Sequence, residues 1–579
     1  MNQQQTHPLA VLQLKGTQEE MGRQFGEIMN VIGQFEPIFD FYPAIAQNLL
    51  LGSMPRRSRN ALAKGVTSFF IKVLQGKMRK HRPSEFSKRT LAALAAAGQS
   101  SRIERELFTM DAFQNSVGLL GKIQILPELG HITGWGNAQL VPACTSVAVW
   151  GDQSRDGNLY HARNFDFPGV DVWDLRPIIV FCTPKNGLRY GYIACRGADV
   201  PGITAFNEAG LTIAFHTRFH RKIGFGGLGV IDFGHKIISE AKTIDDAARI
   251  ARSHKINSTW GAIVTNYSEK GPKAAVIETN YEDVDITYSN LGAESFVNTN
   301  HYLSSKLQHG ELLAAPVFYH HSQSRYIRAQ QLLDEQRTKG TSIIDLQNLL
   351  NDSIDPTSGA QRVMGSTIRQ ITSVKSVIMS PEAKKIHISV GAAPTGSGPY
   401  LEIPISWDSP GHKIIDLPQK VQSKNGKSDS SEQAIAVKHY KNAMLLNDKA
   451  TFSDLDKVIG ELQLAGRYSV NDPSLLFLEA LLHLEKDQFR QGAQLLEEAA
   501  ELESSTFRKR QAELWLARTY SASGKEKRSE HFYRKIQKGN DSTENFVWKK
   551  KAFTDNGSYS ARKLRKVSPN FLLVDANEL

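Results

Sequence analysis

Residues 142–166 begin with Pro-Ala-Cys-Thr-Ser and end with Arg-Asn-Phe-Asp. Between the two motifs lie two β-rich runs joined by an Asp-Gly turn, which is the pattern of a β-hairpin. Such a hairpin returns the chain, so that Arg163 and Asp166 approach Cys144 at the start of the first strand. A nearby arginine favours the thiolate form of a cysteine, and a carboxylate can hold an ammonium or orient a base. The stretch therefore predicts a reactive cysteine at the start of an antiparallel strand.

Each of these residues also has a plainer interpretation. A lone internal cysteine is most often a small buried hydrophobe, and Arg163 and Asp166 could form a surface ion pair. No histidine stands at a spacing typical of a Cys/His pair. If the bond between Ala143 and Cys144 were cut, however, the new α-amine, with an ordinary pKa near ~8, would lie within reach of the thiol. That is the chemistry of an N-terminal nucleophile.

The sequence around this hairpin predicts an α+β fold. Residues before about 140 are mostly helical in composition, whereas short β-rich runs follow one another over 146–215. Further helices are expected after Thr243, where Thr-Ile-Asp-Asp is a capping box, and within 324–350, where a second capping box ends at Asp345. Further strands are expected within 374–390. Strands, helices and strands in this order favour a layered domain over a doubly wound parallel sheet.

The composition after residue 420 changes twice. A polar linker precedes two helical hairpin patterns about 37 positions apart, which is near the period of tetratricopeptide repeats. The alternative is an unrelated helical bundle that packs on the preceding domain. The expected organisation is a helical leader at 1–143, a catalytic domain at 144–420, a linker at 421–435, a helical repeat-like domain at 436–540 and a basic tail at 541–579.

The charge of the chain is unevenly distributed. With 70 Lys and Arg against 59 Asp and Glu, the formal net charge is +11, and the excess lies mainly in 56–89 and 525–566. Neither segment interleaves aromatic residues as a nucleic-acid stacking platform does, so solvated surface is expected and nucleic acid is not. Contact with acidic lipid or another polyanion is the alternative.

Cysteine and histidine usage argues against a disulfide framework and a metal site. The chain has 3 cysteines, which fits a reducing compartment. His309, His320 and His321 lack a metal-ligand spacing, so no metal is predicted. The first residues do not resemble a signal peptide, and no apolar run is long enough for a membrane span. A cytoplasmic protein is expected.

Several further motifs occur in an order that is similar to one family. They extend over about 11–405. They comprise an opening segment at 14–26, the nucleophile motif Cys-Thr-Ser at 144–146, Arg-Asn-Phe-Asp at 163–166, Phe-Asn-Glu-Ala-Gly-Leu at 206–211, Asn-Thr-Asn-His-Tyr at 298–302, Ser-Arg at 324–325 and the segment 391–403. Together they resemble the penicillin acyltransferase-like (acyl-CoA:6-aminopenicillanic acid acyltransferase-like) branch of the N-terminal-nucleophile hydrolases. This branch is related to the choloylglycine hydrolases and the penicillin V acylases.

The resemblance implies a four-layer αββα core and self-cleavage between Ala143 and Cys144. The products would be a small chain, 1–143, and a large chain, 144–579, that stay associated. It also implies an amidohydrolase or acyltransferase that acts on linear, non-peptide amides or acyl thioesters through a cysteine thioester. The expected partners are small-molecule acyl amides or acyl-CoA. No cofactor is expected, and acyl-CoA enters only as a potential substrate.

Matching the motifs residue by residue gives each position a role. Cys144 would be the nucleophile and, through its amine, the general base and acid, with Asp166 holding the amine and Arg163 supporting the thiolate. Asn207 and Asn300 are candidates for the oxyanion hole, and Arg325 could complete the charge network. For Asn207 the alternative is structural, because Asn-Glu-Ala-Gly is also a good hairpin turn; Asn300 and Arg325 could be structural as well.

The competing functional class is an interaction protein. In that interpretation the front domain is an inactive relative kept as a scaffold, and the helical C-terminal domain binds a protein partner. The presence of Ala143 where the related acyltransferases often have Gly leaves room for it, as does the C-terminal region, which the resemblance does not cover. The joint presence of Cys144, Arg163, Asp166 and Asn300 argues against it.

Overall fold

The computed structural model describes most of the chain. The described residues are 7–32, 38–52, 56, 59, 61–123, 144–311, 316–407, 411–417, 431–540, 543–555, 559–565 and 569–574. Ala143, on one side of the expected cleavage point, lies outside them. So do residues 421–430 of the expected linker, whereas residues 431–435 already belong to a helix.

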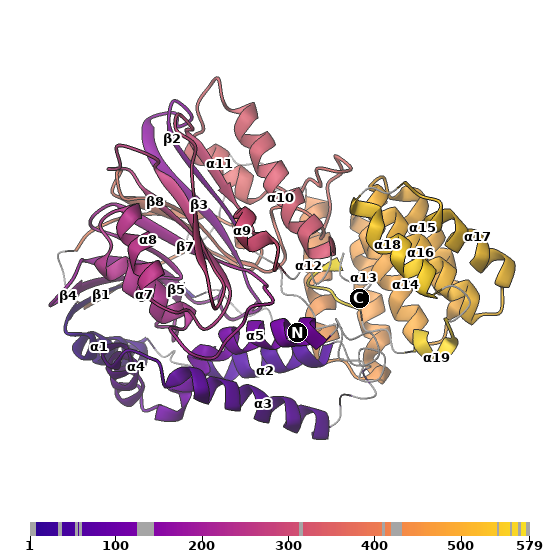
Figure 1. Ribbon diagram of the computed structural model, residues 1–579, viewed down its shortest axis with the longest axis horizontal. Helices are drawn as coiled ribbons and strands as arrows, with labels where there is room; N and C mark the ends of the chain where they lie inside the picture. The colour runs from indigo at the N-terminus through magenta and orange to yellow at the C-terminus, as the bar shows by residue number, and fades with distance from the viewer. Residues whose placement is uncertain are drawn as a thin grey trace.

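Two β-sheets form the core of the region that precedes the C-terminal helices (Figure 1). The nine-stranded sheet has the order β10-β9-β8-β7-β6-β5-β4-β1-β15, with β1 Leu9–Gly16, β4 Pro177–Pro184, β5 Tyr190–Cys195, β6 Thr204–Asn207, β7 Leu211–Thr217, β8 Trp260–Asn266, β9 Ala274–Thr279, β10 Val284–Tyr288 and β15 Gly411–Ile415. The six-stranded sheet has the order β11-β2-β3-β12-β13-β14, with β2 Thr145–Gly151, β3 Gly157–Asp166, β11 Ser295–Asn298, β12 Ser373–Ser380, β13 Lys385–Ser389 and β14 Tyr400–Pro404. The expected mixed α+β class is confirmed.

The two sheets pack face to face and helices cover their outer faces. Ile179 and Phe181 of the larger sheet share one apolar cluster with Met379 and Ile388 of the smaller sheet. The larger sheet carries α7 Val230–Glu240 and α8 Ile244–Ser253, and the smaller carries α10 Pro316–Glu335 and α11 Ile343–Leu350. The layers therefore follow the order helix, sheet, sheet, helix.

Local sequence signals set the helix starts. The Thr243 hydroxyl accepts the Asp246 N–H, and the Asp246 carboxylate accepts the Thr243 N–H. These two bonds form the capping box that the sequence predicts at the start of α8. Ser342 and Asp345 form the same arrangement at the start of α11. Both predictions are confirmed, because this capping depends only on residues three apart.

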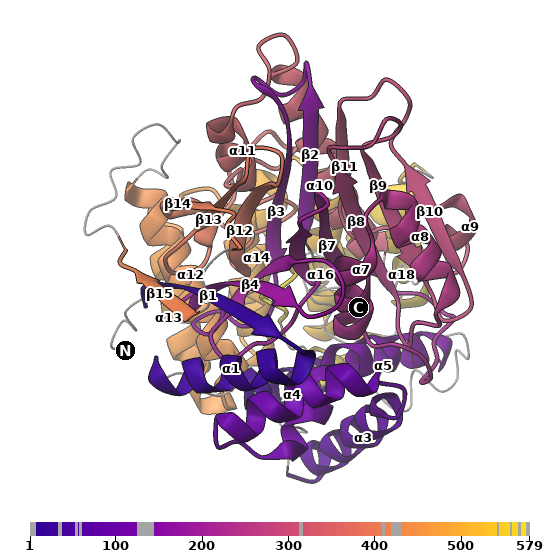
Figure 2. The same cartoon turned by 90° about the vertical axis from the view of Figure 1, so that its left-hand side faces the viewer.

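The leader is helical but also contributes a strand. Its elements are β1, α1 Gln18–Val31, α2 Ile38–Gly52, α3 Ala61–Arg79, α4 Ser84–Ala96, the 3-10 helix η2 Ser101–Phe108 and α5 Thr109–Ile123. Strand β1 pairs in parallel with β4 and antiparallel with β15, inside the larger sheet (Figure 2). The sequence did not predict β1, whose short apolar run finds its partners more than 160 residues away.

Several basic residues of the leader are buried rather than solvated. Arg89 on α4 donates two hydrogen bonds to Asp199 at 2.7 and 2.9 Å. Arg82 pairs with both Glu104 and Asp232 at 3.1 Å. The expectation of a solvated basic segment is wrong for these two residues, because buried carboxylates of the leader, of the loop after β5 and of α7 neutralise their charges.

Helices form the described part of the chain from Ser431 onward. They are α12 Ser431–Lys449, the 3-10 helix η4 Phe452–Asp454, α13 Leu455–Tyr468, α14 Pro473–Glu485, α15 Phe489–Leu502, α16 Thr506–Ala522, α17 Glu526–Gln537, α18 Thr543–Asp555 and α19 Ala561–Leu564. The short α9 Ser305–Gln308 and the 3-10 helix η3 Thr395–Ser397 belong to the sheet region. The expected helical C-terminal region is confirmed, and its classification as tetratricopeptide-like stays a prediction.

This helical region docks on the sheet region through buried charges. Arg362 donates to Glu503 at 2.8 Å, and Arg508 forms ion pairs with both Asp355 and Glu503. All four side chains are at most 4% exposed. Figure 1 shows the helical region, in orange and yellow, beside the two sheets. Within the described residues, no helix is long and apolar enough to cross a membrane.

Candidate active site

Cys144 lies immediately before β2 and is 3% exposed. The β2–β3 hairpin pairs Thr145 with Asn164 and Ser146 with Arg163 in antiparallel register, so it returns the second motif to the cysteine as expected. Arg163 donates from Nη2 to the Cys144 sulfur at 3.4 Å. The sequence-predicted approach of this arginine to the thiol is therefore present in the structure.

Arg163 is fixed by contacts with the opposite sheet. Its guanidinium donates to the carbonyl of Ile203 and to the Thr204 hydroxyl, and also to the carbonyl of Phe215. The side chain is fully buried, so it is not the surface ion pair that was the alternative. A buried positive charge directed at a thiol stabilises the thiolate electrostatically.

Asp166 presents one occupied and one unoccupied carboxylate oxygen. Its Oδ1 accepts the Ser373 hydroxyl at 2.5 Å, whereas its Oδ2 has no hydrogen-bond partner among the described residues. Burial raises the pKa of the Asp166 carboxyl to about 7, although Ser373, Arg325 and Arg163 each act to lower it. Its backbone carbonyl lies 3.9 Å from the Cys144 sulfur. Asp166 thus contacts the thiol through its backbone and has a buried carboxylate oxygen that is available for a further donor.

Two donors hold the carbonyl group of Cys144. Arg325 on α10 donates from Nη1 at 2.9 Å, and His216 at the end of β7 donates from Nδ1 at 3.2 Å. Because a carbonyl only accepts, the His216 proton is on Nδ1, and Nε2 accepts from the Ser146 hydroxyl at 2.8 Å. Burial holds the pKa of His216 well below its ordinary value, so the ring is neutral. His216 therefore orients the cysteine backbone and is not placed as the base of the thiol.

Arg325 connects the cysteine to Asn300. Its Nη2 donates to Asn300 Oδ1 at 3.0 Å, and the Asn300 amide donates to the Thr217 carbonyl and hydroxyl at 3.1 and 3.0 Å. Burial lowers the pKa of Arg325 to about 10, and its electrostatic interactions with Asp166 and Cys144 oppose this shift. The structure thus brings Cys144, Arg163, Asp166, Asn300 and Arg325 into one buried cluster.

Asn207 lies at the other end of strand β6 from this cluster. Its amide donates to the carbonyls of Ile238 and Ala241, and its Oδ1 accepts the N–H groups of Ala209 and Leu211. Thr204, which contacts Arg163, is three residues away, or about 10 Å along a strand. These contacts match the hairpin-turn alternative for Asn207 and differ from the expected oxyanion position.

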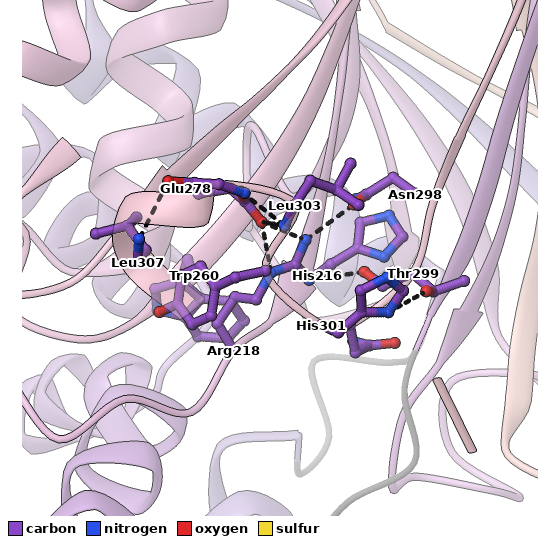
Figure 3. Close-up of polar contacts among 12 residues, drawn as sticks. His216, Arg218, Trp260, Glu278, Asn298, Thr299, His301, Leu303 and Leu307 are labelled. Atoms are coloured by element: carbon purple, nitrogen blue, oxygen red, sulfur yellow. Dashed lines mark hydrogen bonds and ion pairs between the residues drawn. The ribbon is translucent and has the colours of Figure 1, made fainter. Parts of the chain in front are cut away.

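A second buried charge pair, which the sequence did not indicate, supports the segment that carries Asn300. Arg218 donates to Glu278 at 3.1 Å, to Asn298 Oδ1 at 2.8 Å and to the Thr299 carbonyl at 2.6 Å (Figure 3). Both members of the charge pair are 0% exposed. Arg218 and Glu278 are 60 residues apart, so the local sequence gives no signal for the pair beyond a basic residue at the end of a strand.

An apolar cavity of about 80 Å³ opens at Cys144. Its wall includes the aromatic residues Phe165, Phe167 and Trp173 from the sheet region. Leader residues complete it, among them Tyr42 on α2 and Met110 on α5. Such a lining accepts an apolar group next to the sulfur.

Comparison with known proteins gives a family match within the sheet region. Residues 153–393 match the family described as acyl-coenzyme A:6-aminopenicillanic acid acyl-transferase. The resemblance read from the sequence is thereby confirmed. A search of curated proteins gives no match.

The matched segment contains Arg163, Asp166, Asn300 and Arg325 and begins nine residues after Cys144. A family of this description implies acyltransferase activity in general and a small-molecule substrate. Within the described residues, no group of His, Cys, Asp and Glu could hold a metal ion.

Proposed function

We propose that the protein is a cysteine N-terminal-nucleophile amidohydrolase or acyltransferase that activates itself by cleavage before Cys144. One observation carries the proposal: the Cys144 thiol, just before the family-matched region, accepts a hydrogen bond from the buried guanidinium of Arg163, which lies inside that region. The hydrogen bonds from Arg325 and His216 to the Cys144 carbonyl are consistent with it. So is the Asp166 carboxylate oxygen that has no partner among the described residues. The bonds on which we propose that it acts are linear amide or acyl thioester bonds.

Self-cleavage would begin with attack of the Cys144 sulfur on the carbonyl carbon of Ala143. The S–C bond forms, the C–N bond breaks, and the nitrogen takes up the thiol proton, which leaves a thioester. Water then hydrolyses the thioester, giving the carboxylate of Ala143, the Cys144 thiol and a free α-amine. Arg325 and His216 keep the Cys144 carbonyl fixed while this exchange takes place beside it.

In the mature enzyme the α-amine would serve as the base. It takes the thiol proton, the thiolate attacks the acyl carbonyl, and the amine returns the proton to the leaving amine or thiolate. The second half-reaction repeats these transfers with water or an amine as acceptor. The unoccupied Oδ2 of Asp166 is suited to hold the ammonium, whose charge favours the ionised carboxylate.

For an oxyanion role, the Asn300 amide must give up its hydrogen bonds to Thr217 and donate to the substrate oxygen instead. Its Oδ1 is already held by Arg325, which fixes the amide plane, and Thr217 lines the cavity. A preorganised donor of this kind is typically worth ~3 kcal/mol of barrier. Asn300 is therefore the stronger of the two asparagine candidates.

The test is the intact mass of the purified protein under denaturing conditions, measured beside Cys144→Ala. The whole chain is 64.4 kDa, so cleavage before Cys144 gives pieces of about 16 and about 48 kDa. We expect both pieces from the wild type and a whole chain from the variant. A wild-type chain that stays whole would contradict self-activation. It would favour the alternative, in which the helical C-terminal region binds a protein partner.

If cleavage occurs, the substrate class is tested next with N-acyl amides and acyl-CoA. Trapping of a covalent acyl group on the fragment that begins with Cys144, and its absence from Cys144→Ala, would support the thioester. Turnover that persists at the wild-type rate in Cys144→Ala would exclude Cys144 as the nucleophile.

A further inference from the structure

Helix α3 has a row of apolar side chains on its outer face. Leu62, Val66, Phe69 and Val73 are 75%, 49%, 70% and 39% exposed, respectively. We call these four residues the α3 stripe. Single exposed apolar residues are common on proteins, but an aligned row on one helix marks a contact surface.

The α3 stripe follows the helical period. At ~100° per residue its four members lie within about 60° of the helix circumference. The residues that α3 buries against the protein lie on the opposite side, among them Ile71, Leu74 and Met78. The helix therefore has two apolar faces, of which only the inner one is packed against the described protein.

The charge on α3 indicates what the outer face contacts. The helix contains four basic residues and no acidic residue. Lys72 and Lys77 border the α3 stripe, and Lys80 follows it directly after the helix; all three are exposed. An apolar row edged by lysines fits an anionic lipid surface, where the apolar residues enter the headgroup boundary and the lysines meet the negative charge.

Helix α3 is also joined to the cavity at Cys144. Gln75 donates from Nε2 to the Thr109 hydroxyl at 2.8 Å, and Thr109 lines that cavity. Its neighbours Leu107 and Met110 on η2 and α5 line it as well. In Figure 1, α3 runs along the lower edge of the molecule, outside α5 and α2.

We propose that the α3 stripe and its bordering lysines dock the protein on an anionic lipid surface. The cavity next to this surface would then take its acyl group from lipid-derived amides or thioesters. This second statement rests on the proposed function, whereas the docking itself does not.

The test is cosedimentation of the full chain with vesicles of phosphatidylcholine containing phosphatidylserine, compared with vesicles of phosphatidylcholine alone. We expect binding to the anionic vesicles, and weaker binding as salt rises. Phe69→Glu should reduce binding by at least tenfold, because it removes the aromatic group of the stripe and adds a negative charge that the anionic vesicle repels. Leu291→Glu is the matched control, since Leu291 is 85% exposed on another surface and the charge change is the same.

Several outcomes would overturn the docking proposal. They are the absence of vesicle binding by the wild type, equal loss in Phe69→Glu and Leu291→Glu, and unchanged binding in Phe69→Glu. Self-association that Phe69→Glu abolishes, without vesicle binding, would assign the stripe to a second copy of the chain and would also overturn it. Thermal unfolding of both variants checks that they fold.

The docking and the proposed function can fail separately. Vesicle binding is measured on Cys144→Ala as well as on the wild type, and we expect the same binding from both. Binding without self-cleavage would contradict the proposed function alone, and self-cleavage without binding would contradict the docking alone.

Discussion

At the scale of single residues, the site buries charged side chains and leaves one carboxylate oxygen without a hydrogen bond among the described residues. Asp166 is the clearest case, because burial raises its pKa to about 7 while one carboxylate oxygen has no partner in the described structure. Its ordinary pKa is 3.8. A group of this kind binds a proton in the folded state at pH values where the unfolded chain has lost it.

The stability of the uncleaved chain should therefore depend on Asp166. Between about pH 4 and pH 7 the folded state binds more protons than the unfolded state, so this residue lowers stability as the pH rises. Relative to Cys144→Ala/Asp166→Asn, Cys144→Ala should lose up to about 1.4 kcal/mol of unfolding free energy per pH unit in this window. Urea unfolding of both variants across the window measures the difference, and parallel curves would show that Asp166 keeps an ordinary pKa.

The two asparagine candidates should separate in their effects. Asn207→Ala removes four hydrogen bonds at a hairpin turn, so it should lower the unfolding free energy by several kcal/mol and leave kcat of the folded enzyme unchanged. Asn300→Ala should lower kcat by ~100-fold, as expected for a lost oxyanion donor. Chemical denaturation and steady-state kinetics decide the matter, and a large kcat loss in Asn207→Ala alone would reverse the assignment.

At the scale of elements, strand ends and the segments after them carry the site. Strand β7 ends at His216 and Thr217, and the next residue, Arg218, reaches the segment that follows β11. The buried pair Arg218–Glu278 thus fixes the backbone directly before Asn300. Removing one member of a buried pair leaves an uncompensated charge, which typically costs ~3–5 kcal/mol.

We expect Glu278→Gln to destabilise the protein by about that amount. The matched control is Glu208→Gln, because Arg189–Glu208 is a partly exposed pair, 41% and 28%, for which ~1 kcal/mol or less is expected. A double variant, Arg218→Met/Glu278→Leu, removes both charges but leaves the N–H groups of Leu303 and Ser304 without their acceptor, so it should regain only part of the lost stability. Equal stability losses from the two glutamine variants would contradict the role of Arg218–Glu278.

At the scale of the whole molecule, the leader is part of the sheet architecture. Strand β1 lies between β4 and β15, Arg89 pairs with Asp199 in the loop after β5, and Arg82 pairs with Asp232 on α7. Leader residues also line the cavity at Cys144. Loss of the leader would therefore expose an inner sheet edge and open the cavity wall.

The two expected pieces should consequently remain together after self-cleavage. Size-exclusion chromatography under native conditions should give one peak that contains both, and only denaturant should separate them. As a control, Cys144→Ala should elute at the same volume, because the uncleaved chain has the same contacts. A separate small-chain peak under native conditions would show that the leader is released.

Features that depend on neighbours along the chain could be predicted from the sequence. The β2–β3 hairpin, the capping boxes at Thr243 and Ser342, and the helical C-terminal region follow from turn residues, caps and periodicity. The approach of Arg163 to Cys144 belongs here too, since one hairpin connects them.

The contacts made across the two sheets could not be predicted in this way. The tertiary structure placed His216 on the Cys144 carbonyl, Arg218 on Glu278, and Asn207 away from the cluster in which Asn300 lies. It also drew β1 into the larger sheet and buried Arg89. These contacts join segments dozens to hundreds of residues apart, and their energies depend on burial, which a local pattern of residues does not specify.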